Sequence, residues 1–225
     1  MRRFSHETYA ALFSVVYLGL MTNALLVVAC LPLLAVLVAS DPAQSWPVLT
    51  VLVPAVVAPA LTAAFAVFSS YSTDPTVGVI RTFLAAWRAT YRRSLTLGAA
   101  VTGALVVLAV DVVWARGTAL GGVAVPVLVV LALLVLATGV IGLATVAEAP
   151  AARLRDVLRV CVYVAVRRWY LTALSFFSLG LLVAAFTAAP ALALGVAAAP
   201  LLYVVWANSR YSLRPVLPAA APGTA

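Results

Sequence analysis

The sequence predicts an all-α polytopic membrane protein, with about six transmembrane helices and two amphipathic interfacial helices on the cytosolic side. The 225 residues are 66% hydrophobic and only 9% charged, with a mean hydropathy of +1.17. A typical soluble domain is roughly half apolar and about a quarter charged. The few charged residues separate uncharged runs that exceed the roughly 20 residues a membrane helix needs. Composition and spacing together therefore exclude an ordinary soluble fold.

A single integral membrane domain is predicted over residues 1–215, with a disordered tail at 216–225. The predicted spans are 9–39, 47–68, 95–114, 123–147, 171–187 and 191–207. The last two come from one uncharged stretch, Trp169 to Asn208, which as a single helix would be about 60 Å long, twice the hydrocarbon thickness. Pro190 is expected to divide it. The sequence leaves open whether both pieces cross the bilayer.

The first span has an alternative interpretation as a signal peptide. Val27 to Cys30 resembles a lipoprotein cleavage box, which would make the preceding segment removable. The uncharged run continues past the cysteine to Ser40, and His6 and Glu7 dilute the basic N-terminus. A retained transmembrane helix is therefore the favoured interpretation, with Cys30 in lipid and unable to pair with Cys161.

Two prolines interrupt the second span. Pro54 and Pro59 each lack an amide donor and leave a carbonyl free one turn earlier, so this helix is expected to be kinked. The small residues Ala60, Ala63 and Ala64 beside Thr62 predict a surface for close helix packing.

Charge returns in the stretch Asp74–Arg93, DPTVGVIRTFLAAWRATYRR. Asp74 and Pro75 are residues that favour a helix start. Aromatic and aliphatic residues recur beyond them at helical spacing on one face, and arginines lie on an adjacent face. This pattern predicts a helix in the plane of the lipid head groups. The stretch Glu148–Arg168 repeats the design, with Val157 and Cys161 on its apolar face.

The arginines predict the orientation. Thirteen of the fourteen fall on one side of the predicted spans, and Arg116 alone falls on the other. Because loops rich in arginine stay in the cytosol, both termini are expected there, in a bacterial plasma membrane. Short clusters between apolar runs suit anionic lipid head groups, and nucleic acid is not expected as a partner.

The charged and nucleophilic residues predict no catalytic site. No Asp, Glu, His or Arg lies near the middle of a predicted span, where ion-coupled carriers usually place one. One histidine and two cysteines offer no convincing zinc site, and serines such as Ser175 and Ser178 have no histidine base nearby in sequence. We therefore expect neither enzymatic activity nor a metal or cofactor.

The polar residues expected at depth are Thr22, Asn23 and Thr62. An amide in lipid needs a partner, and the carbonyls freed by Pro54 and Pro59 are candidates. The first interpretation is contact between helices, and the sharper alternative is a polar spot that binds a ligand. An intramembrane enzyme would require Asn23, Thr62 and a serine to converge on one cavity.

Several motifs resemble those of the YesL-like family. They are Asn23-Ala24-Leu25-Leu26 running to Leu31-Pro32, the run Pro59 to Phe65, the stretch Phe83 to Ser94, and Asn208 to Pro215. Val27 stands where the family pattern has tryptophan. The resemblance implies a bacterial integral membrane protein of unknown biochemical function. It also implies a link to carbohydrate uptake, since some members are thought to accompany such systems.

The leading hypothesis is a non-enzymatic accessory protein that acts through lipid, partner or self-association contacts. The alternative is a transport component, such as a permease-like partner in an ABC-type sugar importer, for which the match of Glu148-Ala149-Pro150 to a coupling loop is weak. The candidate cytosolic face consists of Arg81, Arg88, Arg92, Arg93, Arg155, Arg159, Arg167 and Arg168.

Overall fold

The computed structural model describes residues 3–41, 44–118, 120–150, 152 and 154–213, without the side chains of 3–8, 10–12 and 154. The predicted tail at 216–225 and the arginines at positions 2, 153 and 214 lie outside these residues. The helices are α1 (Arg3–Ala39), α2 (Trp46–Leu52), α3 (Ala58–Thr73), α4 (Val79–Ala115), α5 (Gly121–Glu148), α6 (Leu154–Arg167), α7 (Trp169–Ala188), α8 (Pro190–Leu192) and α9 (Ala198–Leu213). Two π-helical segments, η1 (Val53–Val57) and η2 (Ala193–Ala197), join α2 to α3 and α8 to α9.

The prediction of six spans in an all-α membrane protein is confirmed. Within the described residues, six helical stretches are long and apolar enough to cross a membrane: Phe13–Ala39, Trp46–Thr73, Val79–Ala115, Gly121–Glu148, Trp169–Ala188 and Pro190–Leu213. The last two form a hairpin that turns at Ala189, so the stretch divided by Pro190 yields two full spans.

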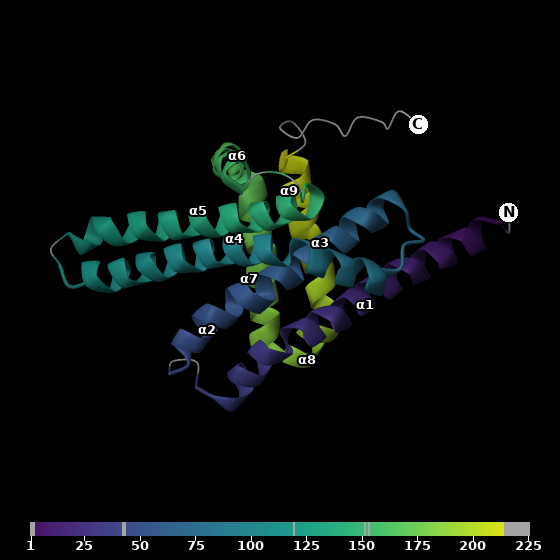
Figure 1. Ribbon diagram of the computed structural model, residues 1–225, viewed down its shortest axis with the longest axis horizontal. Helices are drawn as coiled ribbons and strands as arrows, with labels where there is room; N and C mark the ends of the chain where they lie inside the picture. The colour runs from purple at the N-terminus through teal and green to yellow at the C-terminus, as the bar shows by residue number, and fades with distance from the viewer. Residues whose placement is uncertain (1–2, 42–43, 119, 151, 153, 214–225) are drawn as a thin grey trace.

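The spans form three pairs that converge at one end and spread at the other. Figure 1 shows the α4–α5 pair extending to one side, the α7 and α8–α9 pair running downward, and α1 with α2–α3 between them. The pairs meet around α3, α4 and α9. There Phe65, Phe68, Leu97 and Val205 are buried, each at most 1% exposed. The spread ends carry the short connections after α1, α4 and α7.

The predicted interfacial helix at 74–93 is not a separate element. It begins at Val79 and continues without a break into the third predicted span, so α4 has 37 residues and is roughly 55 Å long. No glycine or proline separates the two parts, and Ser94 at the junction is fully buried and donates a hydrogen bond to Thr62 Oγ1 at 2.9 Å. This buried contact favours continuation of the helix.

The prediction that Asp74 and Pro75 start this helix is wrong. The Asp74 amide closes α3 by bonding Ser70 O, and its carboxylate accepts hydrogen bonds from the amide and hydroxyl of Thr76. These bonds hold the pKa of Asp74 below its ordinary value. The stretch is therefore a turn between α3 and α4, because a carboxylate occupied by residue 76 cannot cap a helix that begins at Val79.

The second predicted amphipathic helix is confirmed as α6. Its apolar residues Val157, Cys161 and Ala165 are buried against α5 and the end of α9, while Arg155 and Arg159 are exposed. In the first half of α4, Phe83, Trp87 and Tyr91 form a ladder with ring centroids 5.9 and 6.2 Å apart. Phe83 is buried and the other two are half-buried, so this face packs on the protein, whereas head-group contact was predicted for it.

The irregularity predicted for the second span takes the form of a π-helical segment. Pro54 lies inside η1, and Pro59 follows in the first turn of α3. The last span has the same build, although no irregularity was predicted for it. Its segment η2 also has five residues and is also followed by a helix of 16 residues. Both 16-residue helices end in a Ser-x-Tyr-Ser sequence, at Ser69–Ser72 and Ser209–Ser212.

Small residues let the spans approach closely. Ala60, Ala63 and Ala64 are fully buried, as the predicted small-residue surface requires. A Cβ atom added to Gly98 of α4 would lie 2.7 Å from Ala58 Cβ, and one added to Gly142 of α5 would lie 2.9 Å from a methyl group of Leu97. At both glycines the neighbouring span therefore leaves no room for a side chain.

Candidate functional site

Asn23 joins the first span to the last one. Its Nδ2 donates to Gly195 O at 2.9 Å and its Oδ1 accepts from the Ala199 amide at 2.6 Å. Residues 195 and 199 are four apart, so in a regular α-helix these two groups bond each other. The Asn23 amide therefore satisfies the backbone at the end of η2, and its side chain is 2% exposed.

This pairing corrects the predicted partner of Asn23, which was a carbonyl freed by Pro54 or Pro59. The opened backbone that it binds belongs to the other span with a π segment, just before Pro200. A proline in the last span was visible in the sequence. Nothing in the sequence indicated that α1 packs against that span.

The three predicted polar residues do not converge on one cavity. Thr62 donates to Ala58 O within its own helix and accepts a hydrogen bond from Ser94 Oγ. Thr22 is fully buried, and its hydroxyl has no hydrogen-bond partner among the described residues. Ser178 donates to Leu174 O, and Ser175 receives a long 3.5 Å contact from Asn208. The hydrogen bonds of these groups therefore either stay within one helix or link neighbouring helices.

An apolar groove of about 620 Å³ runs between α1 and α9, beside the end of α3. Asn23 and Gly195 lie at one end of its lining, and Tyr71 and Val15 lie toward the other. The Tyr71 hydroxyl is within 2.6 Å of Ser14 Oγ. This groove was not predicted, because it depends on how α1 lies against a span 170 residues away.

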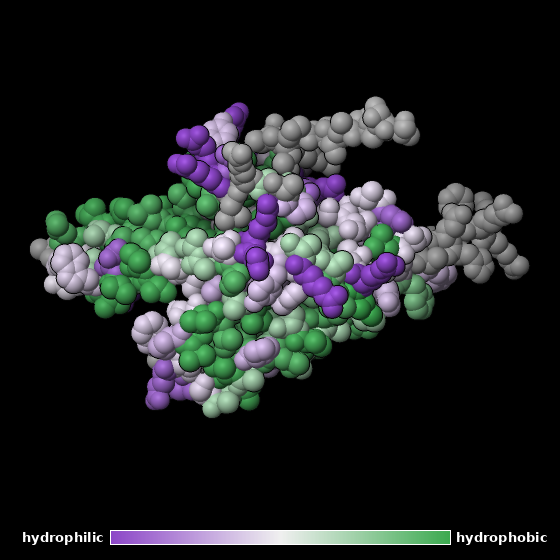
Figure 2. Space-filling model, in the orientation of Figure 1, coloured by the Kyte–Doolittle hydropathy of each residue, from purple (hydrophilic) through white to green (hydrophobic). Residues whose placement is uncertain are grey.

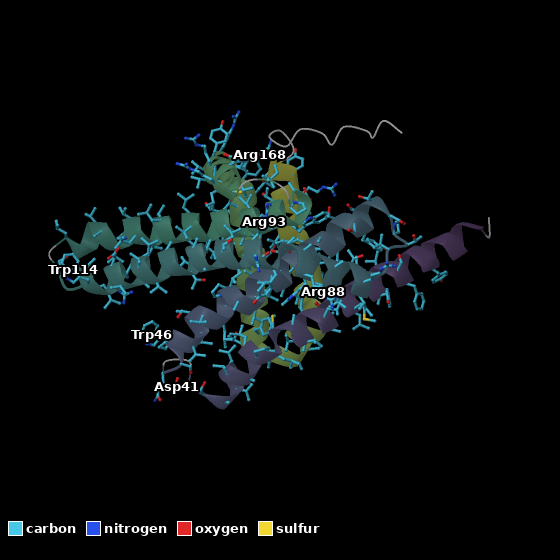
Figure 3. All side chains as sticks on the ribbon, in the orientation of Figure 1. Asp41, Trp46, Arg88, Arg93, Trp114 and Arg168 are labelled. Atoms are coloured by element: carbon cyan, nitrogen blue, oxygen red, sulfur yellow. The ribbon has the colours of Figure 1, made fainter. Side chains whose placement is uncertain are left out.

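Apart from Arg116, the described arginines and the short connections lie at opposite ends of the bundle. In Figure 3, Arg88, Arg93 and Arg168 lie toward the end where the pairs converge, and Asp41, Trp46 and Trp114 lie toward the spread ends. Figure 2 shows hydrophilic residues over α6 and the first half of α4, while the far part of the α4–α5 pair is hydrophobic. We call the arginine-bearing end the basic end.

Two of the predicted arginines of the basic end connect separate elements of the fold. Arg93 donates to the carbonyls of Pro150 and Ala152, which fixes the connection between α5 and α6. Arg168 donates to Tyr211 O at 3.0 Å and stacks over the Tyr211 ring. A cation at the last turn of α9 also complements the helix dipole. Arg167, by contrast, contacts Tyr163 of its own helix, by a hydrogen bond and a ring contact.

Arg210, which was not a predicted site residue, links three spans at the basic end. From α9, its Nη1 donates to Ser72 Oγ at the end of α3, at 2.7 Å. Its Nε lies 3.4 Å from Glu148 Oε1 at the end of α5. The guanidinium also lies 5.2 Å from the ring centre of Trp206. Arg210 was counted only as an orientation signal, because its partners lie 62 and 138 residues away in the sequence.

At the basic end, five arginines remain without a polar partner among the described residues. Arg81, Arg88 and Arg92 lie on α4, Arg155 and Arg159 lie on α6, and all five are exposed. We call them the free arginine set. Of the eight arginines predicted as a lipid or partner face, these five are available for an outside contact, and Arg93, Arg167 and Arg168 are engaged within the chain.

The cysteines are both free, as predicted. Burial between α5 and α6 raises the pKa of the Cys161 thiol to about 11, against a smaller opposing effect of the nearby Thr145 hydroxyl. Within the residues that the structure describes, no three His, Cys, Asp or Glu side chains lie close enough together to hold a metal ion.

Residues 19–112 match the model of a family described as "Protein of unknown function, DUF624". The match runs from the middle of α1 to the last turns of α4, and it includes Asn23, Pro54, Pro59 and Thr62. The YesL-like resemblance is consistent with this match. No curated protein and no solved structure matches the chain.

Proposed function

We propose that this chain, whose residues 19–112 match a family of unknown function, is a non-enzymatic accessory protein of the bacterial plasma membrane. In this proposal both termini face the cytosol, and the basic end binds anionic lipid head groups there. The six spans support the membrane location. The free arginine set is the single observation that carries the rest.

The free arginine set supports head-group binding through its placement and its lack of internal partners. Arginines that only stabilised the fold would be engaged, as Arg93 and Arg168 are. Each basic residue near an anionic membrane surface contributes about 1 kcal/mol of attraction. Five such residues on α4 and α6 would hold a cluster of anionic lipids against the basic end.

The orientation can be tested with reporters fused to the full chain. A reporter that is active only in the cytosol, attached after Ala225, should be active. A reporter that is active only outside, inserted at Gly117, should also be active, since Arg116 is alone on that side. The reverse pattern at both positions would contradict the proposed topology.

The head-group proposal is tested by exchanging arginines for a neutral residue. The variant Arg81→Gln, Arg88→Gln, Arg92→Gln is purified from vesicles of phosphatidylglycerol and phosphatidylcholine, and the retained lipids are quantified by mass spectrometry. The natural chain should retain phosphatidylglycerol in excess over the vesicle composition. With three contacts of about 1 kcal/mol each removed, the variant should lose most of this excess, and added salt should have the same effect.

Arg116→Gln is the matched control, because it removes one arginine from the opposite end. It should leave the phosphatidylglycerol excess unchanged. An excess that survives the triple exchange would show that these arginines only direct topology.

A link to carbohydrate uptake is a second proposal, and only the YesL-like resemblance supports it. The connection at Glu148–Pro150, compared above with a coupling loop, is bound by Arg93 through the carbonyl of Pro150. Purification of the full chain in mild detergent from cells grown on different sugars should recover an ATPase subunit of an importer. Recovery of no such subunit under any growth condition would count against this link and would leave the head-group proposal untouched.

A further inference from the structure

We propose that the groove between α1 and α9 is a binding site for one acyl chain of a phospholipid from the leaflet at the basic end. This proposal requires that the chain spans a membrane, and it does not depend on head-group binding by the free arginine set. Its occupant is defined by the position, the polarity and the size of the groove.

The position of the groove makes hydrocarbon its surroundings. Val15 to Asn23 lie within the first span, Phe68 and Tyr71 within the second, and Gly195 to Val204 within the last. Water is absent from the bilayer core. The groove is open to one side, so the molecules that reach it are lipids or other membrane helices.

The polar groups in the groove are already satisfied by the protein. The Asn23 amide is bound at both ends, to Gly195 O in η2 and to the Ala199 amide in α9, and the Tyr71 hydroxyl is paired with Ser14. The rest of the lining is apolar apart from the exposed Tyr203 hydroxyl and backbone. A polar solute would therefore find no free hydrogen-bonding group at the Asn23 end, whereas an alkyl chain needs none.

The volume of the groove fits one acyl chain and is too small for a membrane helix. A helix with side chains is about 10–12 Å wide, so one turn of 5.4 Å takes roughly 500 Å³. The 620 Å³ of the groove would hold little more than one such turn. A methylene takes about the space of a water molecule, roughly 30 Å³, so the same volume holds about 20 methylenes. That corresponds to one long acyl chain.

The groove is oriented to receive a chain from the basic end. Tyr203 lies in its lining, and Arg210 lies seven residues further along α9, on the same face and about two turns closer to the basic end. Ser72, which accepts a hydrogen bond from Arg210, is next to the lining residue Tyr71. A phosphate near Arg210 would therefore place the attached chain over Tyr203 and toward Asn23.

Gly19 provides a way to fill the groove without disturbing the fold. It lies in the groove lining, and a Cβ atom added there meets nothing within 4 Å. Gly180 on α7 is equally open and lies outside the groove lining. Gly19→Leu and Gly180→Leu are therefore a matched pair, in which only the first occupies the proposed site.

The experiment uses the full chain in vesicles that contain phosphatidylglycerol with a photoactivatable diazirine along one acyl chain. After irradiation, labelled peptides are located by mass spectrometry. We expect the adducts to concentrate on Val16, Leu20, Val196 and Val204. Gly19→Leu should reduce them by about threefold or more, since it occupies the cavity itself, while Gly180→Leu should leave them unchanged.

Val196→Trp, which fills the groove from η2, should have the same effect as Gly19→Leu and guards against misfolding of a single variant. The proposal is overturned if adducts are spread evenly over the exposed faces of α5 and α7, or if neither filling variant reduces the groove adducts. It is also overturned if filling the groove converts a dimer to a monomer in detergent, because a second copy of the chain would then be the occupant.

Discussion

Thr22 and Asn23 are neighbours on α1, are equally buried, and differ in what their side chains do. Asn23 bonds two backbone groups of the last span, whereas the Thr22 hydroxyl has no partner in the described part of the chain. An unpaired buried hydroxyl contributes nothing that its methyl isostere would not. Substitutions at the two positions therefore separate the contribution of the hydrogen bonds to stability from the contribution of burial.

Asn23→Ala should lower the free energy of unfolding by about 1–2 kcal/mol, because hydrogen bonds between membrane helices contribute about 0.6 kcal/mol on average and up to about 1.7. Thr22→Val should change it by less than about 0.5 kcal/mol or raise it slightly. Denaturation in detergent, followed by tryptophan fluorescence, measures both. Equal losses in the two variants would contradict the role assigned to the Asn23 amide.

The sequence identifies Asn23 as a residue that needs a partner, because amides in lipid are costly when unpaired. It does not identify the partner, because any carbonyl freed by a proline would serve. Pro54, Pro59 and Pro200 were all available. The packing of α1 against η2 decides which of the freed carbonyls Asn23 binds. That packing depends on the shapes of the first, second and last spans.

Helix α4 shows how a correct local pattern can give a wrong element. The aromatic and arginine faces of 79–93 are present as predicted, and the arginines at 81, 88 and 92 are exposed. The predicted boundary near residue 94 is absent, because Ser94 and Leu97 are fully buried against neighbouring spans and hold the junction in a helix. Amphipathic periodicity indicates which faces are apolar and leaves the end of the helix undetermined.

Gly98 and Gly103 lie on α4 five residues apart and should respond to alanine in opposite directions. At Gly98 a methyl group would lie 2.7 Å from Ala58 Cβ and 3.2 Å from Pro54 Cα, whereas at Gly103 nothing lies within 4 Å. Gly98→Ala should destabilise the protein by about 1–3 kcal/mol through overpacking. Gly103→Ala should stabilise it by up to about 1 kcal/mol through helix propensity.

Thermal unfolding of the two alanine variants in the same detergent gives the comparison. A gain in stability at both positions would mean that α4 does not pack on η1 and α3 as the structure has it.

At the scale of the whole molecule, the spans and the one-sided arginines follow from the sequence, because length, apolarity and charge are local properties. The convergence of three pairs of spans at the basic end does not follow. It depends on contacts such as Arg210 with Ser72 and Glu148, which connect α9 to α3 and α5. An arginine that binds inside the chain and one that faces outward look alike in the sequence.

Arg210→Gln should therefore destabilise the whole bundle, and Arg159→Gln should not. The Arg210 side chain is 36% exposed and the Glu148 side chain 14%, so we expect a loss of about 1–2 kcal/mol after solvent screening is considered. Arg159 is exposed and has no polar partner in the described structure, so its exchange should cost less than about 0.5 kcal/mol. Equal stability of the two variants in detergent unfolding would remove Arg210 from this role.

The two π-helical segments set the rotational phase of the spans that contain them. A π turn corresponds to one residue inserted into an α-helix, and one residue turns a helix by about 100°. The part of each span before η1 or η2 is therefore rotated by about a quarter turn from where an uninterrupted helix would place it. Deleting one residue from either segment would therefore give a regular helix that keeps the same side chains facing its neighbours, whereas straightening the π turn without a deletion would turn the spread end of that span to a different face.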